Sequence, residues 1–354
     1  MNHLPAPLLL RRRRFLQTLG IAVGAGMWRS IPLGAAPAAG DKPRLRFVQI
    51  NDLHVQAPQR LGNVRPTYAM ANEKARWLLA EINRQLPRPD FVLGIGDLIH
   101  GSALEQLPLD MAEWTRMTAA LQVPFYPGLG NHEVVQRQGN PLYEKAYRDV
   151  YGDNRVNYTF EEGGLRFIML NNSGAPTIPP EVVRARNDWL RGVLQANPSQ
   201  PKILCCHIPI VPVRDESVLA RSFGYSSYIA HDPELLAQVD EHAESMLAVL
   251  SGHLHLTGLV QRKGVHHISI SGTASFPSDY ACFEVFADRL TMQVCQLPAE
   301  LAKAAPPLHG RPRTAEDFTD SAHATAALYQ MGRSEERSLT IPFKRAGLRS
   351  RPPP

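Results

Sequence analysis

Apolar residues along the first third of the chain follow two patterns, one typical of strands and one typical of helices. Short apolar runs at 45–50, 90–95 and 123–126 predict three β-strands. Between them, apolar residues recur every three or four positions, which indicates two amphipathic helices. These positions are Ala71, Ala75, Leu78, Ile82 and Leu86 in the first helix and Met111, Trp114, Met117 and Leu121 in the second. Asp110 is available to cap the second helix. The alternation predicts a layered α/β domain with crossover helices.

The middle of the chain is expected to add a hairpin, another helix and more strands. Strands near 155–161 and 165–171 would be joined at Gly163-Gly164, and a helix is predicted around 181–195. Further strand patterns occupy 202–206, 246–251, 257–262, 265–271 and 281–296. The predicted fold class is therefore α/β, with two packed mixed β-sheets flanked by helices.

The periodic pattern weakens beyond Pro298. Residues 299–327 are rich in alanine, proline and charge, with little periodicity. We therefore expect three parts: a leader over 1–39, one domain over 40–298, and an irregular extension over 299–354.

The leader accounts for the whole excess of positive charge. The 354-residue chain has 38 Lys and Arg against 33 Asp and Glu. Five of the basic residues, Arg11 to Arg14 and Arg29, lie in residues 1–39, which contain no acidic residue. The rest of the chain therefore has 33 of each sign, and its composition gives no indication of nucleic-acid binding.

Residues 1–39 also have the layout of an export signal. Four arginines precede an apolar stretch from Leu19 to Trp28, and small residues follow at 35–39. The stretch is too short to span a bilayer, so we expect no stable membrane anchor. The run Arg12-Arg13-Arg14-Phe15-Leu16 resembles a twin-arginine signal, with an ordinary secretory signal as the alternative. The twin-arginine export machinery is then an expected partner, and the mature protein is expected to be periplasmic or secreted.

Five short motifs rich in metal-ligating side chains each follow a predicted strand. They are Asp52-Leu53-His54, Gly96-Asp97, Gly130-Asn131-His132-Glu133, His207 and Gly252-His253-Leu254-His255. Because ligands bind at the carboxyl ends of strands in α/β sheets, these motifs can meet at one edge. Carboxylates, imidazoles and an amide oxygen, without thiolates, suit two cations such as Fe, Mn or Zn. The sequence contains no nucleophile elbow, P-loop or dinucleotide-binding fingerprint.

The order and spacing of the motifs resemble the calcineurin-like metallophosphoesterase superfamily, over roughly residues 45–297. The resemblance implies a four-layer α/β/β/α sandwich and two metal ions. One ion would be bound by Asp52, His54, Asp97 and His255. The second would be bound by Asp97, Asn131, His207 and His253, so that Asp97 is shared. A hydroxide bridging the two ions would then attack the phosphorus of a small phosphate ester.

His132 and Asp97 are the predicted catalytic residues. Family analogy makes His132 the group that protonates the leaving oxygen or stabilises the transition state, and the alternative is an imidazole that only orients Asn131. The segment Gly96-Asp97-Leu-Ile-His100-Gly101 lacks the second Asp and the Arg of the Ser/Thr phosphatase motif, and the Tyr of purple acid phosphatases. The chain therefore resembles the bacterial cyclic-nucleotide phosphodiesterase-like branch. His100 is a candidate substrate contact, with a supporting or solvated histidine as the alternative.

The favoured function is hydrolysis of a small phosphodiester by an exported dinuclear-metal enzyme. The alternatives are a phosphomonoesterase or nucleotidase with the same site, and a non-catalytic calcineurin-like binding module. The sequence does not decide whether Cys282 and Cys295 form a disulfide. Cys205 and Cys206 are expected to be buried thiols. His323 has no companion motif in the sequence.

Overall fold

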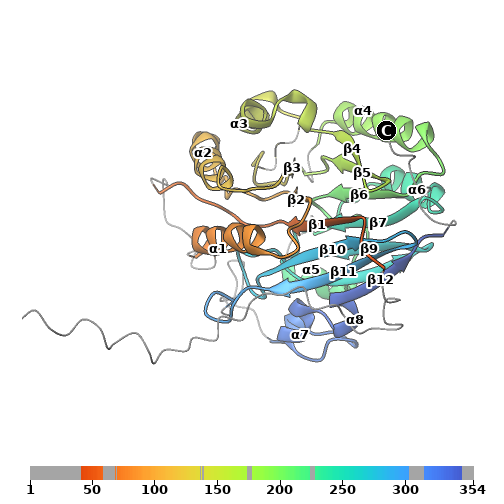
Figure 1. Cartoon of the computed structure of the whole chain (residues 1–354). Coiled ribbons are helices and arrows are strands. Elements are labelled where there is room, and N and C mark those ends of the chain that lie inside the picture. Colours follow the sequence, from red (N-terminus) through yellow and green to blue (C-terminus); the bar gives the residue numbers. More distant parts are fainter. Residues whose placement is uncertain are drawn as a thin grey trace, which may run out of the picture.

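Two mixed β-sheets lie face to face at the centre of the molecule (Figure 1). The computed structural model describes residues 41–58, 68, 70–135, 137, 139–173, 178–223, 228–302 and 315–344. The predicted leader and its export signal therefore lie outside the described residues. The first sheet has the strand order β12-β11-β10-β1-β2-β3, and the second has the order β4-β5-β6-β7-β9-β8.

Most strand boundaries lie within three residues of the predicted apolar runs. The predicted run 281–296 forms two strands instead of one, and the strand at Ser338–Pro342 was not predicted. In the first sheet the strands are β1 (Leu45–Ile50), β2 (Phe91–Ile95), β3 (Phe125–Gly128), β10 (Asp279–Val285), β11 (Arg289–Gln296) and β12 (Ser338–Pro342). In the second sheet they are β4 (Tyr158–Glu162), β5 (Leu165–Leu170), β6 (Lys202–Cys206), β7 (Met246–Ser251), β8 (Gly258–Arg262) and β9 (Val265–Ser269).

Apolar side chains that alternate along the strands fill the space between the two sheets. In β1, Phe47 belongs to this central core, whereas Val48 belongs to the cluster beneath the helices on the outer face. The Phe47 ring stacks on Phe283 of β10 at a centroid distance of 4.6 Å. It also meets the Phe167 ring of β5, in the other sheet, edge-on at 5.2 Å. These ring contacts therefore join the two sheets directly.

Helices cover the outer face of each sheet and complete the four layers. On the first sheet, Leu78 and Ile82 of α1 pack with Trp114 of α2. On the second sheet, Leu190 of α4 packs with Leu235 of α6. The α-helices are α1 (Ala71–Arg84), α2 (Leu107–Thr118), α3 (Pro141–Tyr151), α4 (Pro180–Ala196), α5 (Glu216–Phe223), α6 (Pro233–Glu241), α7 (Ala326–Met331) and α8 (Ser334–Arg337). The predicted four-layer sandwich is confirmed.

The expectation that Asp110 caps the second helix is wrong. Helix α2 begins at Leu107, with a proline in its first turn, so Asp110 lies inside the helix. Its carboxylate instead accepts hydrogen bonds from the backbone N–H of Ala57 at 2.7 Å and of Gly101 at 3.1 Å. Asp110 therefore connects α2 to the loops that follow β1 and β2.

The expectation of an irregular extension over 299–354 is wrong for the part that the structure describes. Strand β12 pairs antiparallel with β11 and places Ile341 opposite Leu290. Tyr329 of helix α7 is completely buried. These contacts join residues far apart in the sequence, and the local hydrophobic pattern on which the prediction rested does not contain them. The domain predicted over 40–298 therefore gains its sixth strand in the first sheet from beyond residue 298.

Buried charges also attach the C-terminal segment, residues 315–344, to the rest of the fold. Arg214 forms an ion pair with Glu336 of α8, with Nη1 2.5 Å from Oε1. His323 lies between two carboxylates, with Nδ1 2.7 Å from Asp320 Oδ1 and Nε2 2.9 Å from Glu336 Oε2. The sequence did not indicate that His323 contacts these two carboxylates.

All four cysteines are free thiols in the structure. Cys282 and Cys295 lie on neighbouring strands with their sulfur atoms 4.0 Å apart. Cys205 and Cys206 are buried in β6, as predicted.

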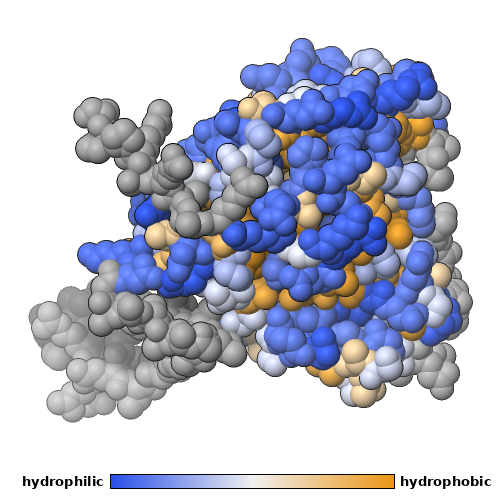
Figure 2. Space-filling view, turned by 90° about the vertical axis from the view of Figure 1, so that its right-hand side faces the viewer, coloured by the Kyte–Doolittle hydropathy of each residue, from blue (hydrophilic) through white to orange (hydrophobic). Residues whose placement is uncertain are grey.

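The face of the molecule in Figure 2 is mostly hydrophilic, and its hydrophobic residues lie in small groups. Among the described residues, the exposed large hydrophobic side chains are Leu86, Leu109, Leu142 and Val150. None of the described helices combines the length and the apolar character needed to cross a membrane.

Lys74 of α1 holds the loop that follows β9. Its Nζ donates hydrogen bonds to the carbonyl oxygen of Ala274 and to Ser278 Oγ, each at 3.0 Å. Burial lowers the pKa of Lys74 to about 8 from its ordinary value of 10.5, because the charged form loses its hydration.

We expect the free energy of unfolding to rise between about pH 8 and pH 10 through a contribution that Lys74→Met removes. The folded chain holds the Lys74 proton less tightly than the unfolded chain. Protonation therefore costs stability below pH 8, and this cost, at most about 3 kcal/mol, disappears as the pH approaches the unfolded pKa. Urea unfolding of both proteins at pH 7 and pH 9.5 measures the difference. An equal change in the two proteins would contradict the assignment.

Candidate metal centre

The predicted ligand residues all lie just beyond the carboxyl ends of strands. Asp52 follows β1, Asp97 follows β2 and Asn131 follows β3 in the first sheet. His207 follows β6 and the turn 252–255 follows β7 in the second sheet. Because β1, β2 and β3 are parallel, as are β6 and β7, these ends open to one edge of the sandwich.

Five of the predicted ligand residues have a left-handed backbone conformation. They are Asp52 (φ 48°), His54 (φ 49°), Asp97 (φ 50°), His253 (φ 69°) and His255 (φ 49°). Each such position costs on the order of 1 kcal/mol for a residue other than glycine. Strain of this kind concentrates at functional sites, where the surrounding structure holds a side chain in one direction.

Asp52, His54 and His255 form the first group of candidate ligands. His255 Nε2 lies 3.3 Å from Asp52 Oδ1 and 3.2 Å from His54 Nε2. His54 Nε2 also lies 3.8 Å from Asp97 Oδ2. Four ligand atoms, two oxygens and two nitrogens, therefore gather around one point.

Asp97, His207 and His253 form the second group. His207 Nε2 lies 3.2 Å from both Asp97 Oδ2 and Asn131 Oδ1. Asp97 Oδ2 thus faces both groups, whereas Oδ1 accepts a hydrogen bond from the backbone N–H of His132 at 2.9 Å. A single carboxylate oxygen lies between the two groups, where it could serve both ions as a shared ligand.

The two groups fit cations in both spacing and chemistry. Two ligands about 2.1 Å from one ion lie about 3.0–3.4 Å apart at the usual coordination angles, and the nearest ligand atoms of each group have this separation. Asp52 Oδ1 is buried and has no hydrogen-bond partner. A buried carboxylate oxygen in that condition is costly unless a cation contacts it.

Glu133 is a supporting residue to which the sequence assigned no role. Its Oε2 accepts hydrogen bonds from the backbone N–H of Asp97 at 2.9 Å and of Gly130 at 2.6 Å, and its Oε1 accepts one from Ile99 at 3.1 Å. Burial and the neighbouring Asp97 carboxylate raise the pKa of Glu133 to about 7. Glu133 ties the turn after β2 to the turn after β3, and its place in the Gly-Asn-His-Glu motif was its only sequence signal.

Gly130 and Gly252 leave the space in which these turns approach each other. A Cβ atom at position 130 would lie 2.2 Å from Asp97 N, and one at position 252 would lie 2.4 Å from Asp52 Oδ2. Both distances are far inside van der Waals contact, so the glycines let backbone and carboxylates meet.

A buried chain of amides orients the Asp52 carboxylate. Gln49 Nε2 donates to Asn51 Oδ1 at 3.0 Å, and Asn51 Nδ2 donates to Asp52 Oδ2 at 2.6 Å. The backbone N–H of His253 donates to the same oxygen at 2.9 Å. Oδ2 is thereby occupied, and Oδ1 faces the first group. Such supporting contacts fix the direction of a metal ligand.

His132 is the most exposed imidazole of those whose Nε2 faces the carboxylates. Its side chain is 27% exposed, against 1% for His54 and 7% for His255. Its Nδ1 contacts the carbonyl oxygen of His100, and its Nε2 lies 3.9 Å from Asp97 Oδ2. The His100 carbonyl thus provides the contact that the absent second Asp of the phosphatase motif would make.

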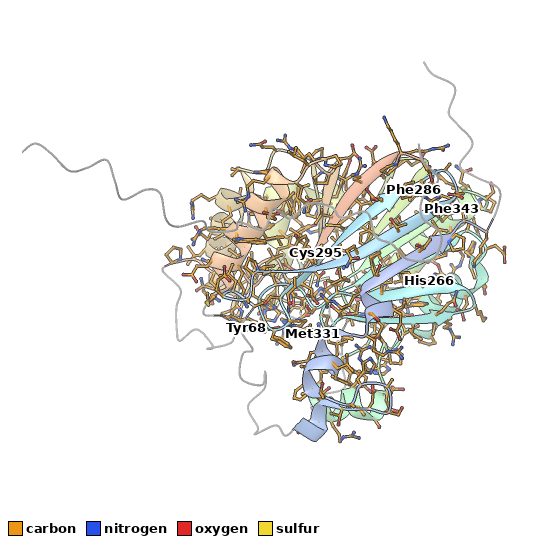
Figure 3. The ribbon with its side chains drawn as sticks, turned by 60° about the horizontal axis from the view of Figure 1, so that its bottom comes forward. Tyr68, His266, Phe286, Cys295, Met331 and Phe343 are labelled. Carbon is orange, nitrogen blue, oxygen red and sulfur yellow. The ribbon has the colours of Figure 1, made fainter. Side chains whose placement is uncertain are left out.

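The His100 side chain is buried rather than solvated. Its ring lies 5.0 Å from the ring of Tyr68, which itself stacks on His54 at 4.4 Å. Figure 3 shows Tyr68 to the left of Met331 and at about the same height in the view. The role of His100 as a substrate contact remains a prediction.

Mutual attraction favours the charged forms of Asp97 and His207 despite their burial. Burial alone would raise the pKa of Asp97, but His207 and His132 hold it well below its usual value. Burial alone would lower the pKa of His207, but the Asp97 and Asp52 carboxylates raise it to about 10. A cation bound to His207 must therefore replace its proton, which links binding to pH.

The sequence profile of the calcineurin-like phosphoesterases matches residues 45–256, which is more than half of the chain and includes all five motifs. The chain belongs to the calcineurin-like phosphoesterase family. Enzymes of this family use a dinuclear metal site, and the chain has two groups of His and Asp side chains that could hold the ions. The prediction of two metal ions is therefore confirmed by the family and by the two ligand groups. The identity of the metals is not determined. The chain is therefore a metallophosphoesterase.

Named relatives share about a quarter of their residues with this metallophosphoesterase. A 3',5'-cyclic-nucleotide phosphodiesterase of Nostoc sp. is 25% identical over 248 residues, covering 69% of this chain and 85% of the relative. A probable glycerophosphodiester phosphodiesterase of Arcobacter nitrofigilis is 24% identical over 208 residues, covering 59% and 71% respectively. A solved dimetal phosphatase of Danio rerio superposes with a TM-score of 0.55 at 18% identity, covering 72% of this chain and 97% of the other, and shares the fold.

Proposed function

We propose that this metallophosphoesterase hydrolyses a small phosphodiester at the centre built around Asp97. The observation that carries the proposal is that Asp97 Oδ2 faces both groups, 3.8 Å from His54 Nε2 and 3.2 Å from His207 Nε2. Two cations bound there would supply Lewis acidity toward the phosphoryl oxygens and activate water.

The ligand roles in this proposal follow the two groups. Asp52, His54, Asp97 and His255 would hold one ion, and Asp97, Asn131, His207 and His253 would hold the other. The two carboxylates carry the only negative charge in this set, so most of the charge of the ions remains available to an anionic ester.

His132 would deliver the proton to the leaving oxygen. Contact of Nδ1 with the His100 carbonyl oxygen sets the ring orientation, and Nε2 then lies on the same side as Asp97 Oδ2. The partial exposure of His132 leaves it accessible to a bound substrate, whereas His54 and His207 are enclosed.

A diester is favoured over a monoester because the relatives from Nostoc sp. and Arcobacter nitrofigilis are both phosphodiesterases by name. The predicted twin-arginine leader at 1–39 supports export, so that the substrate would be met in the periplasm or outside the cell.

Steady-state hydrolysis of bis(p-nitrophenyl) phosphate and p-nitrophenyl phosphate tests the proposal. The purified protein is assayed with Mn, Fe and Zn separately, and with chelator as the control. We expect kcat/KM for the diester to exceed that for the monoester at least about tenfold, or about 1.4 kcal/mol. A preference for the monoester would identify a phosphomonoesterase instead. Hydrolysis of neither ester with any of the metals would favour a binding module.

A further inference from the structure

The loop between β9 and β10, residues 270–278, contributes a side chain to the candidate metal centre. Ser275 lies in this loop, and its Oγ is 2.6 Å from Nδ1 of His255. Both side chains are buried. His255 Nε2 faces Asp52 Oδ1 and His54 Nε2 in the first ligand group. One ring nitrogen of His255 therefore faces the other candidate ligands, and the second contacts the serine.

A cation at the first group would determine which way the hydrogen bond between His255 and Ser275 runs. Metal ions bind the unprotonated nitrogen of a neutral imidazole. With Nε2 as the ligand atom, the ring proton of His255 lies on Nδ1 and is donated to Ser275 Oγ. Such a contact fixes the tautomer and the ring orientation of the ligand.

His255 differs from His207 in the kind of group that contacts Nδ1. His207 Nδ1 contacts the main-chain carbonyl oxygen of Ile95 at 2.9 Å, and this contact does not depend on the Ile95 side chain. His255 Nδ1 contacts a side-chain hydroxyl instead. The orientation of His255 therefore depends on one replaceable group that is not itself a candidate ligand.

Hydrogen bonds hold the loop in place on both sides of the serine. Lys74 of α1 donates from Nζ to the Ala274 carbonyl oxygen and to Ser278 Oγ. Ser278 Oγ in turn donates to the Ser275 carbonyl oxygen at 2.8 Å. The backbone N–H of Ala274 donates to the carbonyl oxygen of Asp52 at 3.0 Å. The hydroxyl of Ser275 is thereby placed before an ion binds.

We propose that Ser275 is a positioning residue for the first metal ion and acts through His255. This role rests on the ligand set of the proposed function and not on the identity of the ester. It adds a residue beyond 256, where the match to the family profile ends. Because His255 belongs to the first ligand group and not to the second, loss of the hydroxyl should affect one ion only.

Calorimetric titration of the metal-free protein with Mn²⁺, and separately with Zn²⁺, tests this role without requiring turnover. We expect Ser275→Ala to weaken the binding of one ion about 10- to 100-fold, the usual effect of losing a group that orients a ligand. The affinity for the other ion should not change. Asp52→Asn identifies the affected ion, because Asp52 belongs to the first group alone. Combining the two substitutions should leave the remaining ion bound as it is in Asp52→Asn.

The matched control is Ser271→Ala, because Ser271 is an equally buried serine of the same loop. Its Oγ donates to the Gly272 carbonyl oxygen at 3.1 Å and accepts from the Asp279 N–H at 3.2 Å. These contacts lie within the loop and at the start of β10. Ser271→Ala should therefore keep both affinities.

A second variant, Lys74→Met, tests the same hydrogen bond from the other end. It leaves the Ser275 hydroxyl in the chain but removes the anchor at Ala274 and Ser278. We expect weaker binding of the same ion, to a smaller extent than in Ser275→Ala. Loss of the ammonium charge alone would strengthen the binding of a cation, so tighter binding in Lys74→Met would contradict the anchoring of the loop.

Unchanged affinities in a Ser275→Ala protein whose circular dichroism matches the wild type, or equal weakening of both ions, would overturn the role of Ser275 and leave the proposed function intact. Equal effects of Ser275→Ala and Ser271→Ala would overturn it too. A wild-type protein that binds neither Mn²⁺ nor Zn²⁺ would contradict both. Selective weakening of one ion without diester hydrolysis would support the role of Ser275 and contradict the phosphodiesterase.

Discussion

Asp97→Asn is expected to lower kcat/KM for ester hydrolysis by more than about a hundredfold and to reduce the content of both metal ions. Loss of a residue that merely orients a ligand already costs about 10- to 100-fold, and Asp97 Oδ2 faces both groups directly. An amide is neutral and has one oxygen, so it cannot keep the hydrogen bond from His132 N–H and also serve both ions with negative charge. Metal content per chain and kcat/KM are measured on the same preparation.

Two further variants separate a shared ligand from a general effect of lost charge. Asp52→Asn changes a carboxylate that belongs to the first group alone, and we expect it to lower metal content by one ion rather than two. Asp149→Asn changes an exposed carboxylate on α3, paired with Lys145, and should leave both measurements unchanged. If Asp97→Asn and Asp52→Asn each release one ion, Asp97 is not the bridge.

Arg214→Met is expected to lower the free energy of unfolding by about 3–5 kcal/mol. The Arg214 side chain is buried, with Nη1 2.5 Å from Glu336 Oε1 and Nη2 donating to the carbonyl oxygen of Thr257 at 2.5 Å. Its Nε donates to the Tyr329 carbonyl oxygen at 3.1 Å. Methionine fills much of the volume but leaves a buried carboxylate and two carbonyl groups without these donors. Urea denaturation measures the loss.

The matched control for this variant is Arg262→Met, because Arg262 pairs with Asp240 at 2.8 Å but is 43% exposed. Exposed pairs contribute about 0–1 kcal/mol, so this variant should unfold almost like the wild type. Adding Glu336→Leu to Arg214→Met should recover part of the lost stability, because it removes the buried Oε1 atom that has lost its Arg214 donor. Equal effects of the two arginine variants would show that the C-terminal segment contributes little to the stability of the fold.

The sequence predicted helices correctly where apolar residues recur at helical spacing. It missed helices that are marked mainly by an N-cap residue. Helix α1 was evident from its periodic apolar residues. Helices α3 and α6 were not predicted, although Asn140-Pro141 and Asp232-Pro233 each combine a capping residue with a proline at the first helical position. Both caps form: Asn140 accepts from Leu142 N–H, and Asp232 from Leu235 N–H.

Sequence alone identified the motifs, their order and the strands before them, because each motif is a short local pattern beside a local apolar run. Which atoms of Asp97 and Asp52 face the ions could not be predicted, because hydrogen bonds from residues distant in the sequence determine it. Glu133 is the clearest example, since its place in the Gly-Asn-His-Glu motif does not show that its carboxylate accepts three backbone N–H groups in a buried turn.

The amino-acid sequence by itself determined the α/β class, the sandwich of two sheets, the family and the inventory of candidate ligands. These features depend on hydrophobic periodicity and on residue type, and both can be recognised in short stretches of the sequence. Only the tertiary structure decided that the two groups converge on Asp97 Oδ2, that His100 contributes a carbonyl to His132, and that the C-terminal segment closes the first sheet. Those features arise where segments far apart in the chain come into contact, and the pairing of such segments is set by packing across the whole domain.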